Sequence, residues 1–172
     1  LSREIARRFN GRYGKIFPEP ESKLHKDLKI LSLQDPSKKM SKSHGESTQV
    51  SLLATPEMIH KKIKIAVTDS DKEVRFNMEE KPAISNLIFI MHLASGRSLK
   101  QIEHDFIGKG YGEFKTKVAD SLVSFLKPIQ TQYKELSKNK KLVEKVLTEG
   151  SKKAQRVAAK TLTEAKKKIG MF

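Results

Sequence analysis

Apolar residues recur every three or four positions along most of the chain, a spacing typical of amphipathic helices. A first helix is expected to begin at Ser2, which can cap it, and to end at Asn10-Gly11. The short apolar run at 30–33 is the only stretch whose pattern favours a β-strand. One strand after one helix cannot bury both of its faces, so the rest of its sheet is expected in a longer parent chain.

Behind residue 47 every periodic segment indicates helix. Thr55 followed by Pro56 is a helix-start signal. Residues 83–95 are apolar nearly all round, which predicts the most buried helix of the chain. Further helices are expected, in chain order, at 98–106, 114–136, 142–150 and 154–169. The expected fold is therefore mainly α, with the end of an α/β layer in residues 1–47 and a bundle of about six helices in residues 48–172.

The net charge of +15 is concentrated near the C-terminus, where residues 127–172 carry 13 basic and 4 acidic side chains. A basic end on a near-neutral middle suggests a polyanion partner such as RNA, with a solvated lysine-rich surface as the alternative. Candidate phosphate contacts in this third are Lys138, Lys140, Lys141, Lys152, Lys153 and Arg156. The chain has no cysteine, which excludes disulfides and thiolate metal sites, and its apolar runs are too short to span a bilayer.

The sequence Lys39-Met40-Ser41-Lys42-Ser43, or KMSKS, follows the predicted strand and precedes the helical part. Its lysines offer mobile ammonium groups and its serines offer hydroxyl donors, a combination suited to a polyphosphate. A lysine on a flexible stem can follow a phosphate whose negative charge grows during a reaction. The alternative is an ordinary solvated loop, because lysine- and serine-rich segments often face water. From the residues alone, we therefore hypothesise that this loop forms one side of a site for a nucleoside triphosphate.

Taken with its neighbours, the KMSKS motif resembles the second signature of class I aminoacyl-tRNA synthetases. The whole chain is similar to the C-terminal half of bacterial-type tryptophanyl-tRNA synthetases. The resemblance also rests on residues 6–14 (ARRFN and RYG), 66–70 (AVTDS) and 110–115 (GYGEFK). The order of these segments favours the tryptophan enzymes over their tyrosine relatives.

This resemblance implies that ATP and tryptophan give tryptophanyl-adenylate and pyrophosphate, and that the tryptophanyl group then moves to the 3′ end of tRNA(Trp). It assigns the KMSKS loop, helped by the Mg²⁺ that accompanies ATP, to stabilising the leaving pyrophosphate. Lys42 is the first candidate for this contact and Lys39 the second. The remaining ATP contacts that it implies are made by Met40, Ser41 and Ser43 and, through its backbone, by Ile30.

The resemblance also implies a division of the chain and a set of partners. Residues 1–47 would be the last part of a Rossmann-like catalytic domain, and residues 48–172 an α-helical anticodon-binding domain. Tyr111 and Tyr133 could stack on anticodon bases, with core packing as the alternative. The family is dimeric and cytoplasmic, without membrane association. Its dimer interface lies largely in the other half of the fold, so residues 1–172 alone could be monomeric.

Two departures from the family pattern change the expectations. The signature usually continues with Asp and Pro, whereas here His44-Gly45-Glu46 follows, which predicts a different anchoring and a more mobile loop. The first class I signature, of the His-x-Gly-His type, does not occur in residues 1–172, so these residues alone are expected to be inactive. The alternative function is a non-catalytic, basic RNA-binding module that retains a synthetase-like loop. No metal site is expected, because the five histidines lack ligand spacing.

Overall fold

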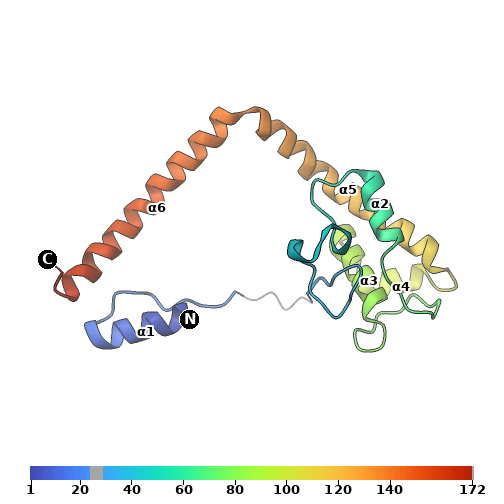
Figure 1. Cartoon of the computed structure of the whole chain (residues 1–172), viewed down its shortest axis with the longest axis horizontal. Coiled ribbons are helices and arrows are strands. Elements are labelled where there is room, and N and C mark those ends of the chain that lie inside the picture. The colour runs from blue at the N-terminus through green and yellow to red at the C-terminus, as the bar shows by residue number, and fades with distance from the viewer. Residues whose placement is uncertain (24–28, 172) are drawn as a thin grey trace. The chain divides into compact units, whose positions relative to one another are not determined.

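The computed structural model describes residues 1–23 and 29–171. Its α-helices and two 3₁₀ turns are α1 (Ser2–Tyr13), η1 (Lys42–His44), η2 (Glu46–Thr48), α2 (Pro56–Lys64), α3 (Pro82–Ser95), α4 (Leu99–Asp105), α5 (Tyr111–Lys138) and α6 (Lys140–Lys168) (Figure 1). The described residues contain no β-strand, which confirms that the chain is mainly α. None of the described helices combines the length and apolar character needed to cross a membrane.

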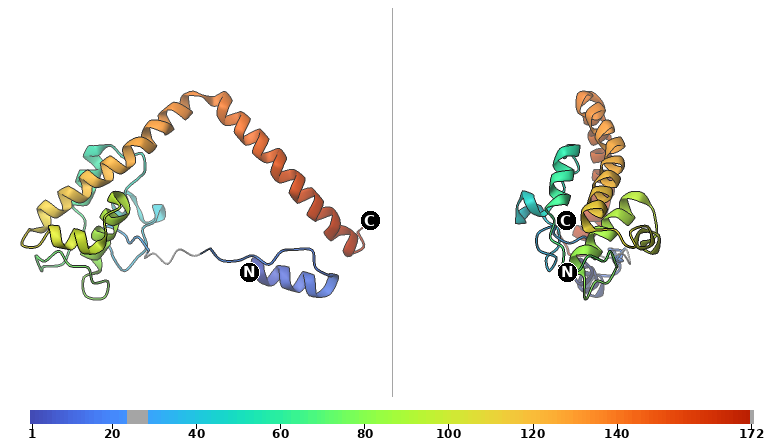
Figure 2. Two further views of the ribbon diagram at one scale, coloured as in Figure 1. Left: turned by 180° about the vertical axis from the view of Figure 1, so that it is seen from behind. Right: turned by 90° about the vertical axis from the view of Figure 1, so that its right-hand side faces the viewer.

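The chain divides into two compact units. One is Asp27–Glu135, and the other joins Leu1–Lys26 with Leu136–Phe172. In the first of these, α2, α3 and α4 gather along the early part of α5, as both views in Figure 2 show. This unit also contains the KMSKS motif, so it determines how the motif is held.

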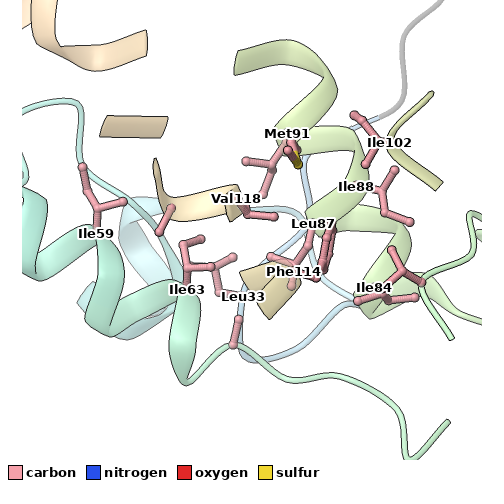
Figure 3. Packing of buried hydrophobic residues seen from close by; sticks show 14 of the residues in the cluster. Leu33, Ile59, Ile63, Ile84, Leu87, Ile88, Met91, Ile102, Phe114 and Val118 are labelled. Atoms are coloured by element: carbon pink, nitrogen blue, oxygen red, sulfur yellow. The ribbon is translucent and has the colours of Figure 1, made fainter. Parts of the chain in front are cut away.

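The core of the Asp27–Glu135 unit is built around α3, in which every side chain from Ile84 to Met91 is buried. This confirms the prediction of a helix that is apolar nearly all round. The neighbouring elements contribute side chains that meet α3 in one cluster, including Leu33, Ile59, Ile63, Ile102, Phe114 and Val118 (Figure 3). Phe106 and Phe114 pack edge to face within it, with ring centroids 5.0 Å apart.

The helix ends of this unit follow the expected local chemistry. Thr55 caps α2 by accepting a hydrogen bond from the Met58 amide, and Pro56 occupies the first helical position. Ser98 and Gln101 form a capping box at the start of α4. Gly96 ends α3 in the left-handed conformation. All three signals were readable in the sequence.

The predicted strand at 30–33 is wrong. The backbone there makes one antiparallel bridge, between Leu31 and Lys39, and no regular strand. The reason is that the side-chain amide of Asn86 on α3, and not a second strand, takes up both backbone groups of Leu31. A segment whose hydrogen bonds go to a side chain cannot extend into a sheet.

The predicted break between two C-terminal helices is also wrong, because α6 is continuous through Gly150. A single glycine inside a helix lowers helix stability by only about 1 kcal/mol relative to alanine, and the strong helix formers on both sides of Gly150 (alanine, lysine and glutamate) offset this loss. The described residues after position 47 therefore hold five α-helices, one fewer than predicted. The buried cluster around α3 ends at Leu126, and most large apolar side chains beyond it are exposed, among them Tyr133, Leu136, Val146, Leu147, Val157 and Leu162.

In the second unit, α1 begins at Ser2 without a side-chain cap and ends at Tyr13, three residues later than predicted. Asn10 does not end this helix, because its side chain holds the segment that follows. Its Oδ1 accepts hydrogen bonds from the amides of Ile16 and Phe17, and its Nδ2 donates to the Phe17 carbonyl at 2.7 Å. This turn brings Phe17 against Phe9, with ring centroids 4.9 Å apart.

Candidate functional site

The KMSKS motif forms the return limb and tip of a hairpin-like loop. The Met40 amide donates to the Ile30 carbonyl at 3.0 Å, and the Ser32 amide donates to the Lys38 carbonyl at 2.8 Å. Asp35 shapes the turn between the limbs, because its Oδ1 accepts hydrogen bonds from the amide and the hydroxyl of Ser37. The base of the loop is therefore paired, although no regular strand forms.

Asn86 fastens this loop to the most buried helix. Its Oδ1 accepts from the Leu31 amide at 2.8 Å and its Nδ2 donates to the Leu31 carbonyl at 2.9 Å. Asn86 is 3% exposed, so these two hydrogen bonds are largely shielded from water. The Leu33 backbone adds two more links, to the Thr48 carbonyl and to the Val67 amide.

The tip of the loop is held by hydrogen bonds among its own residues. Ser41 caps η1, its hydroxyl lies 2.8 Å from that of Ser43, and the His44 amide donates to the Ser41 carbonyl at 3.3 Å. The Thr48 hydroxyl donates to the Gly45 carbonyl at 2.7 Å. Gly45 has φ +97° and ψ 160°, a conformation open essentially to glycine alone. Glycine at this position therefore permits the two consecutive 3₁₀ turns.

Two of the three lysines in this loop keep their charges available. Lys38 is paired with Asp35 at 2.8 Å, and its hydrogen bond helps to lower the pKa of the Asp35 carboxyl to about 2. Lys39 and Lys42 are exposed and form no ion pair within the part of the chain that the structure describes. An incoming polyanion would thus meet two uncompensated ammonium groups and the Ser43 hydroxyl.

Ile30 and Met40, both predicted to contact ATP, lie together at one side of the loop. They line a cavity of about 470 Å³ that is otherwise bounded by apolar side chains of α3 and α5 and by Val50 and Leu52. The Ile30 carbonyl is already used by the Met40 amide, and among the described residues no partner takes the Ile30 N–H, which could therefore meet a base edge. Because the walls are apolar, this cavity suits a flat or hydrophobic group better than a phosphate.

Substituting Gly45 by alanine is expected to strain the loop by about 1–3 kcal/mol, since a Cβ is poorly tolerated at this φ although the space around it is open. The readout is amide hydrogen exchange at Thr48, whose N–H donates to the Gly45 carbonyl and should lose protection. Gly150→Ala is the matched control, because Gly150 is helical, equally open and should become slightly more stable. Unchanged protection at Thr48 would contradict the role assigned to Gly45.

The AVTDS and GYGEFK segments meet in the structure, where Asp69 and Tyr111 join a cluster of hydrogen bonds and ion pairs around Lys81 (the Lys81 cluster). Lys81 is 4% exposed, and its Nζ donates to Asp71 at 2.7 Å and lies 3.6 Å from Asp69. The Tyr111 hydroxyl donates to Asp69 at 2.5 Å. Burial would lower the pKa of Lys81, but the hydrogen bond with Asp71 and the nearby negative charges outweigh it and the pKa is raised. Burial raises the pKa of Tyr111 to about 12.

Of the two tyrosines considered for base stacking, Tyr111 is thus held in place by its hydroxyl and is partly buried, which favours the packing alternative. Tyr133 is exposed on α5. Asn86, in contrast, is a residue whose importance was not inferred from the sequence. The signal was present, because Ser85-Asn86 is a polar pair inside an otherwise apolar helix, and buried polar groups need partners.

The candidate phosphate contacts all face solvent. Lys138 lies at the end of α5 and the other five lie on α6. Lys141, Lys152 and Arg156 share one face of α6, because spacings of eleven and four residues return to nearly the same side of a helix. This face is separate from the exposed apolar side chains of α6, so the helix is amphipathic along its length.

The described residues contain no group of three or more His, Cys, Asp or Glu side chains that could hold a metal ion. His25 lies outside the described residues.

The sequence of residues 1–127 matches the family model described as tRNA synthetases class I (W and Y). The chain belongs to this family of class I tRNA synthetases. Two relatives within it, both named Tryptophan--tRNA ligase, come from Halalkalibacterium halodurans and Bacillus subtilis and are 48% and 43% identical over 99% of this chain. The chain spans about half the length of these curated relatives, 52% of each.

Solved structures of the same family share the fold. The tryptophanyl-tRNA synthetase of Mycoplasma pneumoniae superposes on 98% of this chain and 51% of its own, with a TM-score of 0.87 and 28% identity. That of Campylobacter jejuni, in a structure complexed with ADP and tryptophan, covers 98% of this chain and 52% of its own, with a TM-score of 0.69 and 26% identity.

Proposed function

We propose that this chain is the KMSKS-loop and tRNA-binding half of a tryptophan–tRNA ligase. The observation that carries the proposal is the KMSKS loop itself, whose Lys39 and Lys42 are exposed and uncompensated while its base is fastened to α3. Relatives named Tryptophan--tRNA ligase that match nearly the whole chain support tryptophan as the amino acid.

In the proposed reaction, the tryptophan carboxylate attacks the α-phosphorus of ATP, and the bond to the bridging oxygen breaks to release pyrophosphate. Negative charge grows on the departing β- and γ-phosphates, so ammonium groups that reach them stabilise the transition state more than the ground state. Lys42 takes the first share of this contact and Lys39 the second. Backbone and hydroxyl groups of Met40, Ser41 and Ser43 complete it, with Mg²⁺ bound to the ATP.

The second step, transfer of the tryptophanyl group to the 3′ end of tRNA(Trp), requires the protein to bind the RNA as well as the nucleotide. We assign residues 1–47 to the end of the Rossmann-like catalytic domain and residues 48–172 to the anticodon-binding domain. The exposed basic residues of α6 supply phosphate contacts, which position RNA without reading its sequence. A homodimer of the whole enzyme belongs to the same proposal.

The test is amino-acid-dependent ATP–pyrophosphate exchange by a protein that extends upstream of Leu1, with tryptophan and tyrosine compared side by side. Exchange with tryptophan alone is the expected result. Residues 1–172 by themselves are expected to give no exchange above the blank, because they lack the His-x-Gly-His signature. No exchange by the extended protein with either amino acid would favour the non-catalytic RNA-binding module.

A further inference from the structure

A second basic feature is formed by residues outside both the KMSKS loop and α6. The last turns of α2 and the first turns of α5 enclose a pocket of about 360 Å³. Its lining residues are His60, Lys61, Lys64, Tyr111, Gly112, Lys115 and Thr116. The lining contains three lysines and no carboxylate, so its fixed charges are positive.

Lys115 is the central charge of this pocket. Its Nζ donates to the Ala66 carbonyl at 2.7 Å and lies 3.4 Å from the Lys64 carbonyl, so it caps the end of α2. Burial lowers the pKa of this ammonium group, and no described carboxylate forms an ion pair with it. A partly buried ammonium that meets only carbonyl oxygens retains most of its charge uncompensated, and an anion in the pocket would balance it.

The other lining groups add to the same potential. Lys61 and Lys64 are exposed and make no ion pair among the described residues. The carboxylate of Asp120 lies 3.3 Å from the His60 imidazole and forms an ion pair with Lys117 at 3.6 Å, which partly neutralises it. Gly112 lies in the first turn of the 28-residue α5, and a Cβ built there would meet nothing within 4 Å. The glycine therefore adds no side chain between the pocket and the start of α5, where helix N–H groups carry partial positive charge.

The Tyr111 side of the pocket is held by hydrogen bonds. The Tyr111 hydroxyl donates a hydrogen bond to Asp69, and Asp69 belongs to the cluster of charged groups around the buried Lys81. Hydrogen bonds from Tyr111 and Lys115, both on the first turns of α5, thus tie this end of α5 to the end of α2 and the segment that follows it. A preformed pocket of this kind binds an oxyanion with little loss of conformational entropy.

We propose that this pocket binds a phosphate group of the RNA backbone, as a contact of the tRNA-binding half separate from α6. The proposal rests on the proposed function, since an RNA partner makes a backbone phosphate the natural occupant. A phosphodiester carries one negative charge and accepts hydrogen bonds from ammonium and backbone N–H donors, and these are the groups that the pocket presents. Free inorganic phosphate has the same chemistry and is distinguished by experiment.

The experiment measures affinity of the 172-residue chain for a tRNA(Trp) transcript by fluorescence anisotropy over a series of salt concentrations. Lys61→Gln combined with Lys64→Gln should lower the affinity by about tenfold at ~0.1 M salt and reduce the slope of log K against log salt by about one to two. Lys72→Gln with Lys100→Gln is the matched control, because it removes two exposed lysines elsewhere in the same unit and should change the affinity less than about twofold. Circular dichroism checks that each variant is folded.

Two further arms separate the possible causes. Lys152→Gln with Lys153→Gln tests the contacts assigned to α6, and titration with inorganic phosphate, followed by the ¹H–¹⁵N signal of Gly112, tests the pocket alone. Normal RNA affinity in the Lys61/Lys64 variant, with weakened affinity in the Lys152/Lys153 variant, overturns the pocket and leaves the proposed function standing. If the Lys72/Lys100 control variant loses as much RNA affinity as the Lys61/Lys64 variant, the loss reflects net charge, and this result also overturns the proposed pocket. If phosphate shifts the Gly112 signal but the Lys61/Lys64 variant keeps its RNA affinity, the pocket binds free anions and the RNA contact is overturned. If the wild-type chain has no affinity for the transcript, the proposed function itself is refuted.

Discussion

Lys42→Ala, introduced into a protein extended upstream of Leu1, is expected to slow tryptophan-dependent ATP–pyrophosphate exchange by about 10²–10³-fold. The Lys42 ammonium group is exposed, uncompensated and set in the 3₁₀ turn at the tip of the loop, so its removal deletes a charge without disturbing the core. The dissociation constant of tryptophan should stay nearly unchanged, because the effect is confined to the leaving pyrophosphate. Single-turnover formation of the adenylate and equilibrium binding of tryptophan separate the two quantities.

Lys38→Ala is the control for this result, since it removes a lysine from the same loop whose charge is already paired with Asp35. Its effect on exchange should be much smaller. Parallel losses of exchange and of tryptophan binding in Lys42→Ala would assign Lys42 a structural role. A full effect in Lys38→Ala would show that the net charge of the loop matters more than the position of one ammonium group.

Asn86→Ala is expected to lower the free energy of unfolding by about 2–4 kcal/mol. The substitution removes two buried hydrogen bonds and leaves the N–H and C=O groups of Leu31 without their partner. Because Leu31 is part of the base of the loop, the extended protein should also lose exchange activity. Urea unfolding followed by circular dichroism measures the stability, and the exchange assay measures the position of the loop.

Ser85→Ala is the matched control for Asn86→Ala. Ser85 is the neighbouring buried polar residue of α3, and its hydroxyl accepts a hydrogen bond from the Asn77 amide at 2.8 Å, away from the KMSKS loop. It should cost stability by about 1–2 kcal/mol and leave exchange intact in the folded protein. If both variants lose exchange in proportion to stability, Asn86 acts on the fold as a whole and has no special effect on the loop.

The helical part of the chain was predictable where local chemistry and apolar pattern agreed. The Thr55-Pro56 start, the helix that follows Ser98 and the fully apolar α3 each formed as expected, because their signals lie within a few residues of one another. The KMSKS loop was also predictable as a candidate phosphate site, since lysine and serine side chains bind phosphate through their own functional groups. What its sequence could not reveal was which of three lysines is paired.

The failures have a common cause, which is that long-range partners override local pattern. Residues 30–33 have the apolar pattern of a strand, but a side chain 55 positions away takes up the hydrogen bonds that a strand would share. Gly150 marks a helix end in many sequences, yet here no tertiary contact requires a stop and α6 continues. The pocket between α2 and α5 was invisible for the same reason, since its lysines come from segments about 50 residues apart.

The base and the tip of the KMSKS loop differ in the lengths of their backbone hydrogen bonds. We expect the two parts to move on different timescales for this reason. At the base, the links to Ile30, Lys38 and Thr48 carbonyls measure 2.8–3.0 Å and rest on a buried helix. At the tip, the three backbone links around Gly45 measure 3.3–3.4 Å and face solvent. The tip can therefore reorganise in nanoseconds to microseconds while the base opens only on the much slower timescale of core unfolding. Movement confined to the tip would change how far Lys42 reaches while the paired base stays in place.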